Sequence, residues 1–236
     1  MVLTFLLSAF AEDSLWPDLS EPPRVGGGSR DAAVIVAIED YGSVTDIPGA
    51  KKNGLDWYSY LTDGRGISPS RVKLLTDNTA TKEGIEGAIR KAAAAVRPGG
   101  TLWFVFIGHG APAADGQDGL LVGWDTQQSA ESVYARGIQQ DAALALLEEG
   151  SQSHTVAIID ACFSGRSDGD VALVSGLQMM VPDYGRSVGQ DTVVLSAGTS
   201  TQFAGPLPGL SRPAPPSPTS PSARCMAGEM TMTMAL

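Results

Sequence analysis

Short apolar runs alternate with longer amphipathic stretches through the middle of this chain, from residue 31 to about residue 206. The run AAVIVAI at 32–38 is typical of a strand buried on both faces, and TLWFVFI at 101–107 has the aromatic and β-branched composition of a central strand. Such alternation predicts an α/β domain with a largely parallel sheet. The predicted strands are 32–38, 71–75, 101–107, 154–159 and 192–197, the predicted helices are 50–61, 81–96 and 139–147, and a minor hairpin includes 120–122.

Local signals mark both ends of the helix at 81–96. Thr81 can cap its first turn, where Glu83 places a negative charge at the positive end of the helix dipole. The sequence Pro98-Gly99-Gly100 then stops the helix. These signals make it the predicted helix with the best-defined ends.

The N-terminal residues differ in composition from the middle of the chain. Residues 1–11 form a short apolar run that closes in Ala-Phe-Ala, a small-x-small pattern that predicts a signal peptide, although no positive charge precedes the run. A buried N-terminal strand is the alternative. Residues 12–30 contain three prolines and a Gly-Gly-Gly run and are interpreted as a linker. The signal predicts a secreted or periplasmic protein, and without it the protein is expected in the cytoplasm.

The C-terminal residues 207–236 form a tail rich in Pro, Ser and Met. Seven of the fifteen prolines lie between Pro206 and Pro221, and four of the seven methionines lie between Met226 and Met234. The tail has neither helical nor strand periodicity. A Met-Thr repeat can be encoded by bases that, read one position earlier, spell consecutive Asp codons, so residues from about 213 are interpreted as an out-of-frame sequence. A genuine Pro-rich tail is the alternative.

Charge and composition exclude several functions. The net charge of −10 argues against nucleic acid or anionic lipid as the main partner, and no run of eighteen apolar residues predicts membrane insertion. The chain has only two histidines and two cysteines, and they form neither a CxxC nor an HxxxH spacing. A structural zinc site and a disulfide framework are therefore not expected.

Chemically reactive side chains follow two of the predicted strands. The strand at 101–107 runs into GHG, which contains His109, and the strand at 154–159 runs into DACFSG, which contains Cys162. Ligands of open parallel sheets bind beyond the carboxyl ends of the strands. If the two strands are neighbours, the imidazole and the thiol face each other at one edge of the sheet.

A thiol beside an imidazole suits nucleophilic catalysis. A free cysteine has a pKa of about 8.5, and a nearby imidazole makes the thiolate more available and later protonates a leaving amine. The backbone amides of Gly110 and Cys162 can form an oxyanion hole, and the glycines beside His109 allow substrate to approach closely. The alternative for Cys162 is a buried, inert core thiol.

The motifs GHG and DACFSG, in this order and spacing, resemble those of caspase-like cysteine peptidases. The form D-x-C-x-S-G is similar to that of the metacaspase and bacterial orthocaspase branch, whereas animal caspases have Q-A-C-x-G. The segments VIVAIEDY and IPGAKKNGLDWYSYL also resemble the opening strand, loop and helix of the family. The resemblance covers residues 31–206 and implies a three-layer α/β/α caspase-like fold with a mostly parallel central sheet.

The resemblance also implies a function for each motif residue. Cys162 would attack the scissile carbonyl of a protein or peptide substrate, with His109 as acid and base. Asp160 would lie at the floor of the S1 pocket and pair with an Arg or Lys at P1, so cleavage after basic residues is expected. The alternative for Asp160 is a cap on the following turn. The protein is expected to act as a monomer.

The chain departs from the family pattern in three places. Asn53 stands where the family usually has a second acidic residue of the S1 pocket, and Ile107 stands where a small polar residue is common. The sixth strand and final helices of the family fall in the Pro-rich tail, so the C-terminal strand and helices are expected to be missing. A catalytically inactive binding scaffold, or a truncated pseudoenzyme, is therefore the alternative function.

No cofactor is required by this chemistry. Some metacaspases need calcium, so calcium is an open possibility, and its oxygen ligands would come from Asp115, Asp118 and Asp125 or from Asp168 and Asp170. Neither set has a defined loop spacing. Solvated acidic loops are the preferred interpretation, and no metal ligand is assigned.

Overall fold

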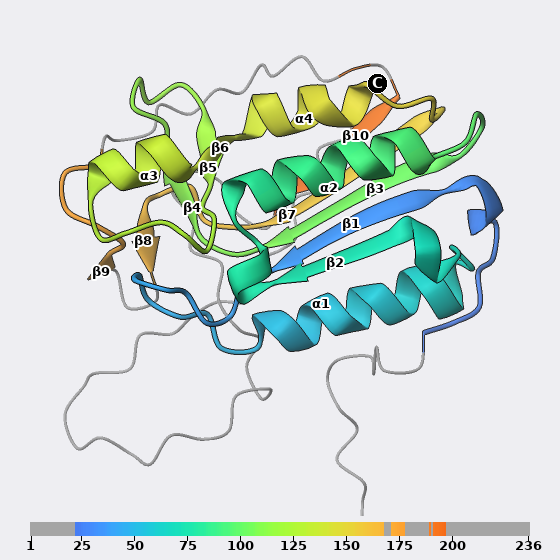
Figure 1. Cartoon of the computed structure of the whole chain (residues 1–236), viewed down its shortest axis with the longest axis horizontal. Coiled ribbons are helices and arrows are strands. Elements are labelled where there is room, and N and C mark those ends of the chain that lie inside the picture. Colours follow the sequence, from blue (N-terminus) through green and yellow to red (C-terminus); the bar gives the residue numbers. More distant parts are fainter. Residues whose placement is uncertain (1–21, 168–170, 178–188, 190, 197–236) are drawn as a thin grey trace, which may run out of the picture.

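The computed structural model describes residues 22–167, 171–177, 189 and 191–196. A five-stranded sheet, in which all neighbouring strands run parallel, forms the centre of the fold (Figure 1). All five predicted strands are present, so the largely parallel sheet is confirmed. In order across the sheet, the strands are β10 (Thr192–Ser196), β7 (His154–Asp160), β3 (Thr101–Ile107), β1 (Ala32–Ala37) and β2 (Val72–Thr76).

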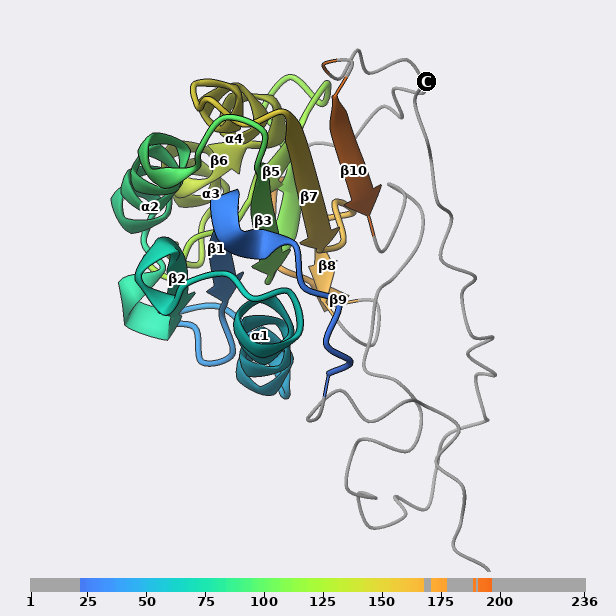
Figure 2. The same ribbon diagram turned by 90° about the vertical axis from the view of Figure 1, so that its right-hand side faces the viewer.

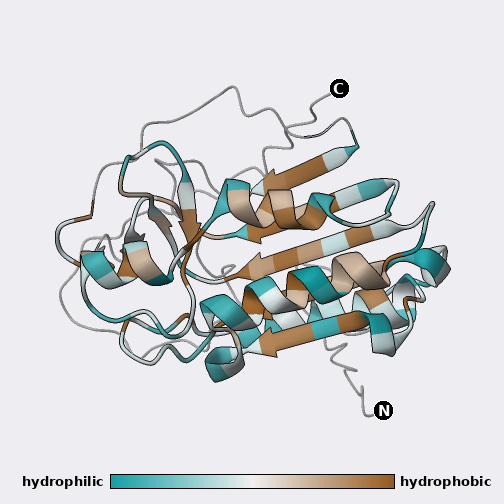
Figure 3. Cartoon of the chain, turned by 45° about the horizontal axis from the view of Figure 1, so that its top comes forward, coloured by the Kyte–Doolittle hydropathy of each residue, from teal (hydrophilic) through white to brown (hydrophobic). Residues whose placement is uncertain are grey.

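Helices cover both faces of the sheet and make a three-layer domain (Figure 2). Helix α1 (Ala50–Ser59) packs on one face, and α2 (Lys82–Ala95) and α4 (Gln140–Glu148) pack on the other. Side chains of β1 alternate between the two layers, and every residue of this strand is buried. The sheet is coloured as largely hydrophobic, while the helices show hydrophilic bands (Figure 3). The expected three-layer α/β/α arrangement is confirmed.

The ends of the helices follow local chemistry. The Thr81 hydroxyl accepts a hydrogen bond from Gly84 N at 3.1 Å and caps α2, with Glu83 in its first turn, as predicted. The helix predicted at 50–61 is α-helical only to Ser59, and residues 60–64 continue it as a π-helical turn. No helix in the described part of the chain is long and apolar enough to span a membrane.

A small antiparallel sheet follows β3. It contains β4 (Gly110–Pro112), β5 (Gly119–Leu121) and β6 (Ile138–Gln139). The predicted hairpin corresponds to β4 and β5, whereas helix α3 (Ala130–Arg136) was not predicted. Arg136 of this helix forms ion pairs with Asp125 and with Glu83 of α2, and these pairs fix the position of α3. The remaining short elements are β8 (Arg166–Ser167), β9 (Val171–Ala172) and 3₁₀ turns at Gly28–Arg30, Pro69–Arg71 and Asp77–Thr79.

Part of the expected linker belongs to the folded unit. The amides of Val25 and Gly26 donate hydrogen bonds to Gly64 O at 2.8 and 2.9 Å, and Gly28 N donates to Arg65 O at 2.9 Å. Gly28 is buried, and a Cβ there would lie 2.8 Å from the Arg65 carbonyl oxygen. Residues 25–28 of the expected linker therefore contact the chain at residues 64–67. The predicted signal at 1–11, the rest of the linker to residue 21 and the tail at 207–236 lie outside the described residues.

Candidate functional site

The strands that precede His109 and Cys162 are neighbours in the sheet. Ile107 of β3 is in register with Asp160 of β7, and Gly108 N donates a hydrogen bond to Asp160 O at 3.2 Å. The two strands are parallel, so the segments that carry the imidazole and the thiol leave the sheet at the same edge. The two strands are neighbours, as the predicted pairing of His109 with Cys162 requires.

The two segments also touch through their backbones. A Cβ placed on Gly110 would lie 2.6 Å from the carbonyl oxygen of Cys162 and 2.9 Å from its carbonyl carbon. A Cβ on Gly119 of the next strand would lie 2.4 Å from the Phe163 ring. Only glycine at these positions lets the small sheet pack this closely on the segment that carries Cys162.

Replacing Gly110 with alanine is expected to separate these segments. The obstructing atoms belong to the backbone of Cys162 and cannot rotate away, so the thiol moves relative to His109. If Cys162 and His109 act together in catalysis, a displacement of this kind should lower kcat/KM on a peptide substrate by about 10²-fold. Gly87→Ala is the control, because a Cβ on Gly87 of α2 has no heavy atom within 4 Å. If Gly110→Ala retains wild-type activity, the close approach has no catalytic role.

His109 is held in one orientation by the loop after β1. Its side chain is 8% exposed, and its Nε2 atom lies 2.6 Å from the carbonyl oxygen of Thr45. A carbonyl only accepts hydrogen bonds, so Nε2 carries the proton. In the neutral ring, Nδ1 is then left as the proton acceptor. A neutral ring in this tautomer can act as a general base through Nδ1.

Tyr41 supports both the backbone and the ring of His109. The Tyr41 hydroxyl accepts a hydrogen bond from His109 N at 2.8 Å and donates one to Val122 O at 3.2 Å. It thereby bridges two strand ends, while its ring lies 4.9 Å from the imidazole between centroids. Burial raises the pKa of Tyr41 well above its usual range, so the hydroxyl stays protonated and able to donate.

The surroundings of His109 favour its neutral form. Burial lowers the pKa of the imidazole, and the hydrogen bond to Thr45 O and the charge of Asp46 offset this only in part. The ring is therefore neutral at pH 7 and can take up a proton. This is the state that removal of a thiol proton needs.

The amide of Gly110 is directed away from its strand partner. Along the ladder between β4 and β5, His109 O accepts a hydrogen bond from Val122 N at 2.9 Å and Ala113 N donates one to Asp118 O at 2.8 Å, so His109 and Ala113 stand at hydrogen-bonded positions. Antiparallel ladders alternate, so the Gly110 N–H points out of the ladder. Gly110 also abuts the half-buried Cys162, and this geometry suits the predicted oxyanion hole.

The Asp160 carboxylate has no cationic partner among the residues that the structure describes. Its side chain is partly buried, and burial raises its pKa. Among the described residues, none donates a hydrogen bond to this carboxylate or forms an ion pair with it. No contact of the described residues supports the alternative role of Asp160 as a turn cap. Asn53 lies exposed in α1, and Ile107 is buried in the core beneath that helix.

Three of the aspartates named as calcium candidates lie in the described part of the chain and have partners within the protein. Asp125 pairs with Arg136, and Asp118 accepts hydrogen bonds from Gly119 N at 2.6 Å and Asp141 N at 3.2 Å, at the start of α4. Asp115 accepts one from Gln117 N at 3.0 Å. Within the described ranges, no three His, Cys, Asp or Glu residues gather as a metal site. Asp168 and Asp170 lie outside them.

Two groups of the site were not predicted from the sequence. The Thr45 contact is made by a backbone carbonyl, which every residue type possesses, so no motif marks it. Tyr41 closes the segment VIVAIEDY, which served only as part of the predicted first strand and loop. Neither group has a sequence pattern that points to His109, which lies more than sixty residues further along the chain.

Comparison with known proteins identifies the domain. Residues 30–221 match the family model of the caspase domain, peptidase family C14. Similar solved structures include protein GSU0716 from Geobacter sulfurreducens, with 19% identity and a TM-score of 0.46 over 56% of this chain and 50% of that one. Caspase-1 from Spodoptera frugiperda is 17% identical, with a TM-score of 0.43 over 72% of this chain and 59% of that one. The chain thus covers less than two thirds of either structure. No curated protein matches it.

Proposed function

Because this chain belongs to the caspase-domain family of cysteine peptidases, we propose that it is an endopeptidase that uses Cys162 as nucleophile and His109 as acid and base. The observation that carries the proposal is the His109 imidazole, locked by Thr45 O at 2.6 Å with Nδ1 as acceptor. It lies on the segment whose next residue, Gly110, abuts the backbone of Cys162. A cysteine that only filled space in the core would require neither the fixed imidazole nor the close approach of Gly110.

The proposed reaction follows from these positions. The Nδ1 atom of His109 takes the thiol proton, and the Cys162 thiolate attacks the scissile carbonyl carbon. The amides of Gly110 and Cys162 stabilise the oxyanion that forms. The imidazolium then gives its proton to the leaving amine as the carbon–nitrogen bond breaks, and water hydrolyses the resulting thioester. Thr45 O stabilises the ring in its charged state by accepting the Nε2 proton.

We place the chain in the metacaspase and orthocaspase branch, with cleavage after Arg or Lys. Asp160 supports this specificity, because a partly buried carboxylate without a cation among the described residues is suited to a guanidinium or an ammonium group. Asn53 and Ile107 depart from the family pattern, but the former is exposed on α1 and the latter packs in the core. Neither departure changes Cys162 or His109, the two proposed catalytic residues.

Asp160→Asn is expected to remove the preference for basic residues. Asparagine keeps the size of the side chain but not its charge, so kcat/KM on a peptide with Arg at P1 falls by about 10²-fold. A peptide with an uncharged P1 residue is the control, and its cleavage should change little. Because burial raises the pKa of Asp160, the carboxylate takes up a proton at a pH above the ordinary value of 3.8. The wild-type preference for Arg should therefore already weaken above pH 3.8 as the solution is acidified. Retained Arg preference in the variant would refute the assignment.

The function is tested with three fluorogenic peptides that carry Arg, Lys or Asp at P1. The purified chain is incubated with each, with and without calcium, beside the Cys162→Ala variant. Cleavage of the Arg and Lys peptides alone, dependent on Cys162, is the expected result. No Cys162-dependent turnover on any peptide would favour the alternative of an inactive caspase-fold scaffold.

A further inference from the structure

Asp77 has an unusual backbone conformation at the edge of the sheet where the site lies. It directly follows β2, and its φ of 40° makes it the only described non-glycine residue with a positive φ. Aspartate and asparagine adopt this left-handed region more readily than most residues, but it remains uncommon. A strained residue persists where surrounding contacts hold it in place.

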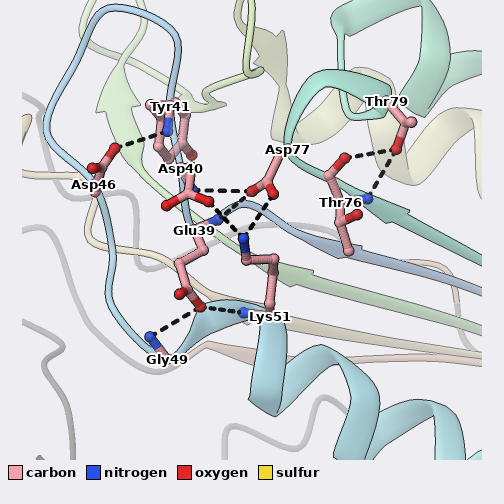
Figure 4. Close-up of polar contacts among 9 residues, drawn as sticks. All are labelled: Glu39, Asp40, Tyr41, Asp46, Gly49, Lys51, Thr76, Asp77 and Thr79. Atoms are coloured by element: carbon pink, nitrogen blue, oxygen red, sulfur yellow. Dashed lines mark hydrogen bonds and ion pairs between the residues drawn. The ribbon is translucent and has the colours of Figure 1, made fainter.

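The contacts of Asp77 join the two ends of one loop (Figure 4). Its Oδ1 atom accepts hydrogen bonds from the amides of Glu39 and Asp40, both at 3.0 Å. Its Oδ2 atom pairs with Lys51 Nζ at 3.1 Å. Glu39 and Asp40 begin the loop after β1, and Lys51 lies in the first turn of α1, where the loop has ended. We call the loop of residues 39–49 the histidine loop.

Further bonds close the histidine loop on itself. The Glu39 side chain accepts from Gly49 N at 3.1 Å and Lys51 N at 3.0 Å, while Glu39 O accepts from Ile47 N at 2.9 Å. Asp46 accepts from Tyr41 N at 2.9 Å. Burial opposes ionisation of Asp77, but bonds from Asp40, Lys51 and Glu39 outweigh it and lower the pKa. The carboxylate therefore stays charged at neutral pH.

The histidine loop is the element that holds His109. It supplies Thr45 O, 2.6 Å from Nε2, and Tyr41 OH, 2.8 Å from the His109 amide. We infer that Asp77 is a positioning residue, which fixes the histidine loop and thereby the tautomer and orientation of the His109 imidazole. Asp77 acts through the loop and does not touch substrate. The inference rests on the proposed function for its kinetic consequence, but its structural part can be tested without catalysis.

Asp77→Asn tests the inference by kinetics. Asparagine tolerates the left-handed conformation but loses the ion pair with Lys51. Expulsion of an amine needs the proton of His109, whereas expulsion of p-nitrophenolate does not. We therefore expect kcat/KM on a peptide amide to fall about tenfold and that on the p-nitrophenyl ester of the same peptide to fall less than about threefold. Partial unfolding would lower both rates equally. Asp56→Asn, which removes an ion pair with Lys52 elsewhere on α1, should leave both unchanged.

Imidazole NMR provides a readout that does not depend on turnover. The chain has only two histidines, so long-range ¹H–¹⁵N spectra resolve His109 and the exposed His154 as an internal reference. Wild-type His109 should be protonated at Nε2 alone, and Asp77→Asn should show a tautomer mixture. An unchanged tautomer in the variant overturns the inference. If the wild type has no peptidase activity but Asp77→Asn changes the tautomer, the proposed function fails while the positioning role stands.

Discussion

Cys162→Ala is expected to abolish peptide hydrolysis, with kcat lowered by about 10⁴-fold or more. Alanine has no sulfur atom to attack the scissile carbonyl, and no neighbouring group on the described residues can form the same thioester. The half-buried position of Cys162 means that the smaller side chain fits without disturbing the fold. Steady-state rates on an Arg-P1 peptide measure the effect, and circular dichroism verifies that the variant is folded.

Cys225→Ala provides the matched control for this substitution. Cys225 is the only other cysteine of the chain and belongs to the C-terminal tail. Its replacement should leave the rates at the wild-type level. A Cys162→Ala protein with wild-type turnover, or a Cys225→Ala protein without any, would contradict the assignment of the nucleophile.

His109→Asn is expected to lower kcat/KM on peptide amides by about 10³-fold. Asparagine is polar and of similar size but cannot transfer a proton, so both thiol activation and protonation of the amine are lost. The thiol should then react with iodoacetamide with the pH dependence of an ordinary cysteine, whose pKa is about 8.5. His154→Asn is the control, because His154 is exposed at the opposite end of β7 and should tolerate the change.

The pH profile of the wild type gives a second measure of His109. The imidazole must be neutral to accept the thiol proton, so activity falls as the pH drops through its pKa. Burial lowers that pKa from the ordinary histidine value of 6.5, and the acidic limb should lie below pH 6.5. A limb at or above that value, or one that persists in His109→Asn, would show that another group controls the rate.

The sheet and its helices were predictable because their sequence signals are local and strong. The run TLWFVFI forms β3 with the predicted bounds, since each of its residues favours an extended chain in a packed core. Helix α2 begins after Thr81 because the hydroxyl bonds Gly84 N. Helix α3 is too short, at seven residues, to show a helical period, and its tertiary ion pairs with Arg136 are invisible in the sequence.

The neighbouring placement of His109 and Cys162 was predictable for a topological reason. The carboxyl ends of parallel strands meet at one edge, so two motifs that each follow such a strand are brought together once the strands are adjacent. Thr45 could not be predicted, because its contribution is a backbone oxygen. Asp77 could not be predicted either, since its contacts with the histidine loop depend on a left-handed conformation that no residue pattern near it indicates.

The most direct test of the central claim is covalent labelling with a short peptide that has Arg at P1 and an electrophilic ketone in place of the scissile bond. Peptide mapping by mass spectrometry then identifies the modified residue. The prediction is one label per chain on Cys162, absent from Cys162→Ala and formed much more slowly in His109→Asn. A label on Cys225, or labelling of Cys162 no faster in the folded chain than in the unfolded one, would contradict the account.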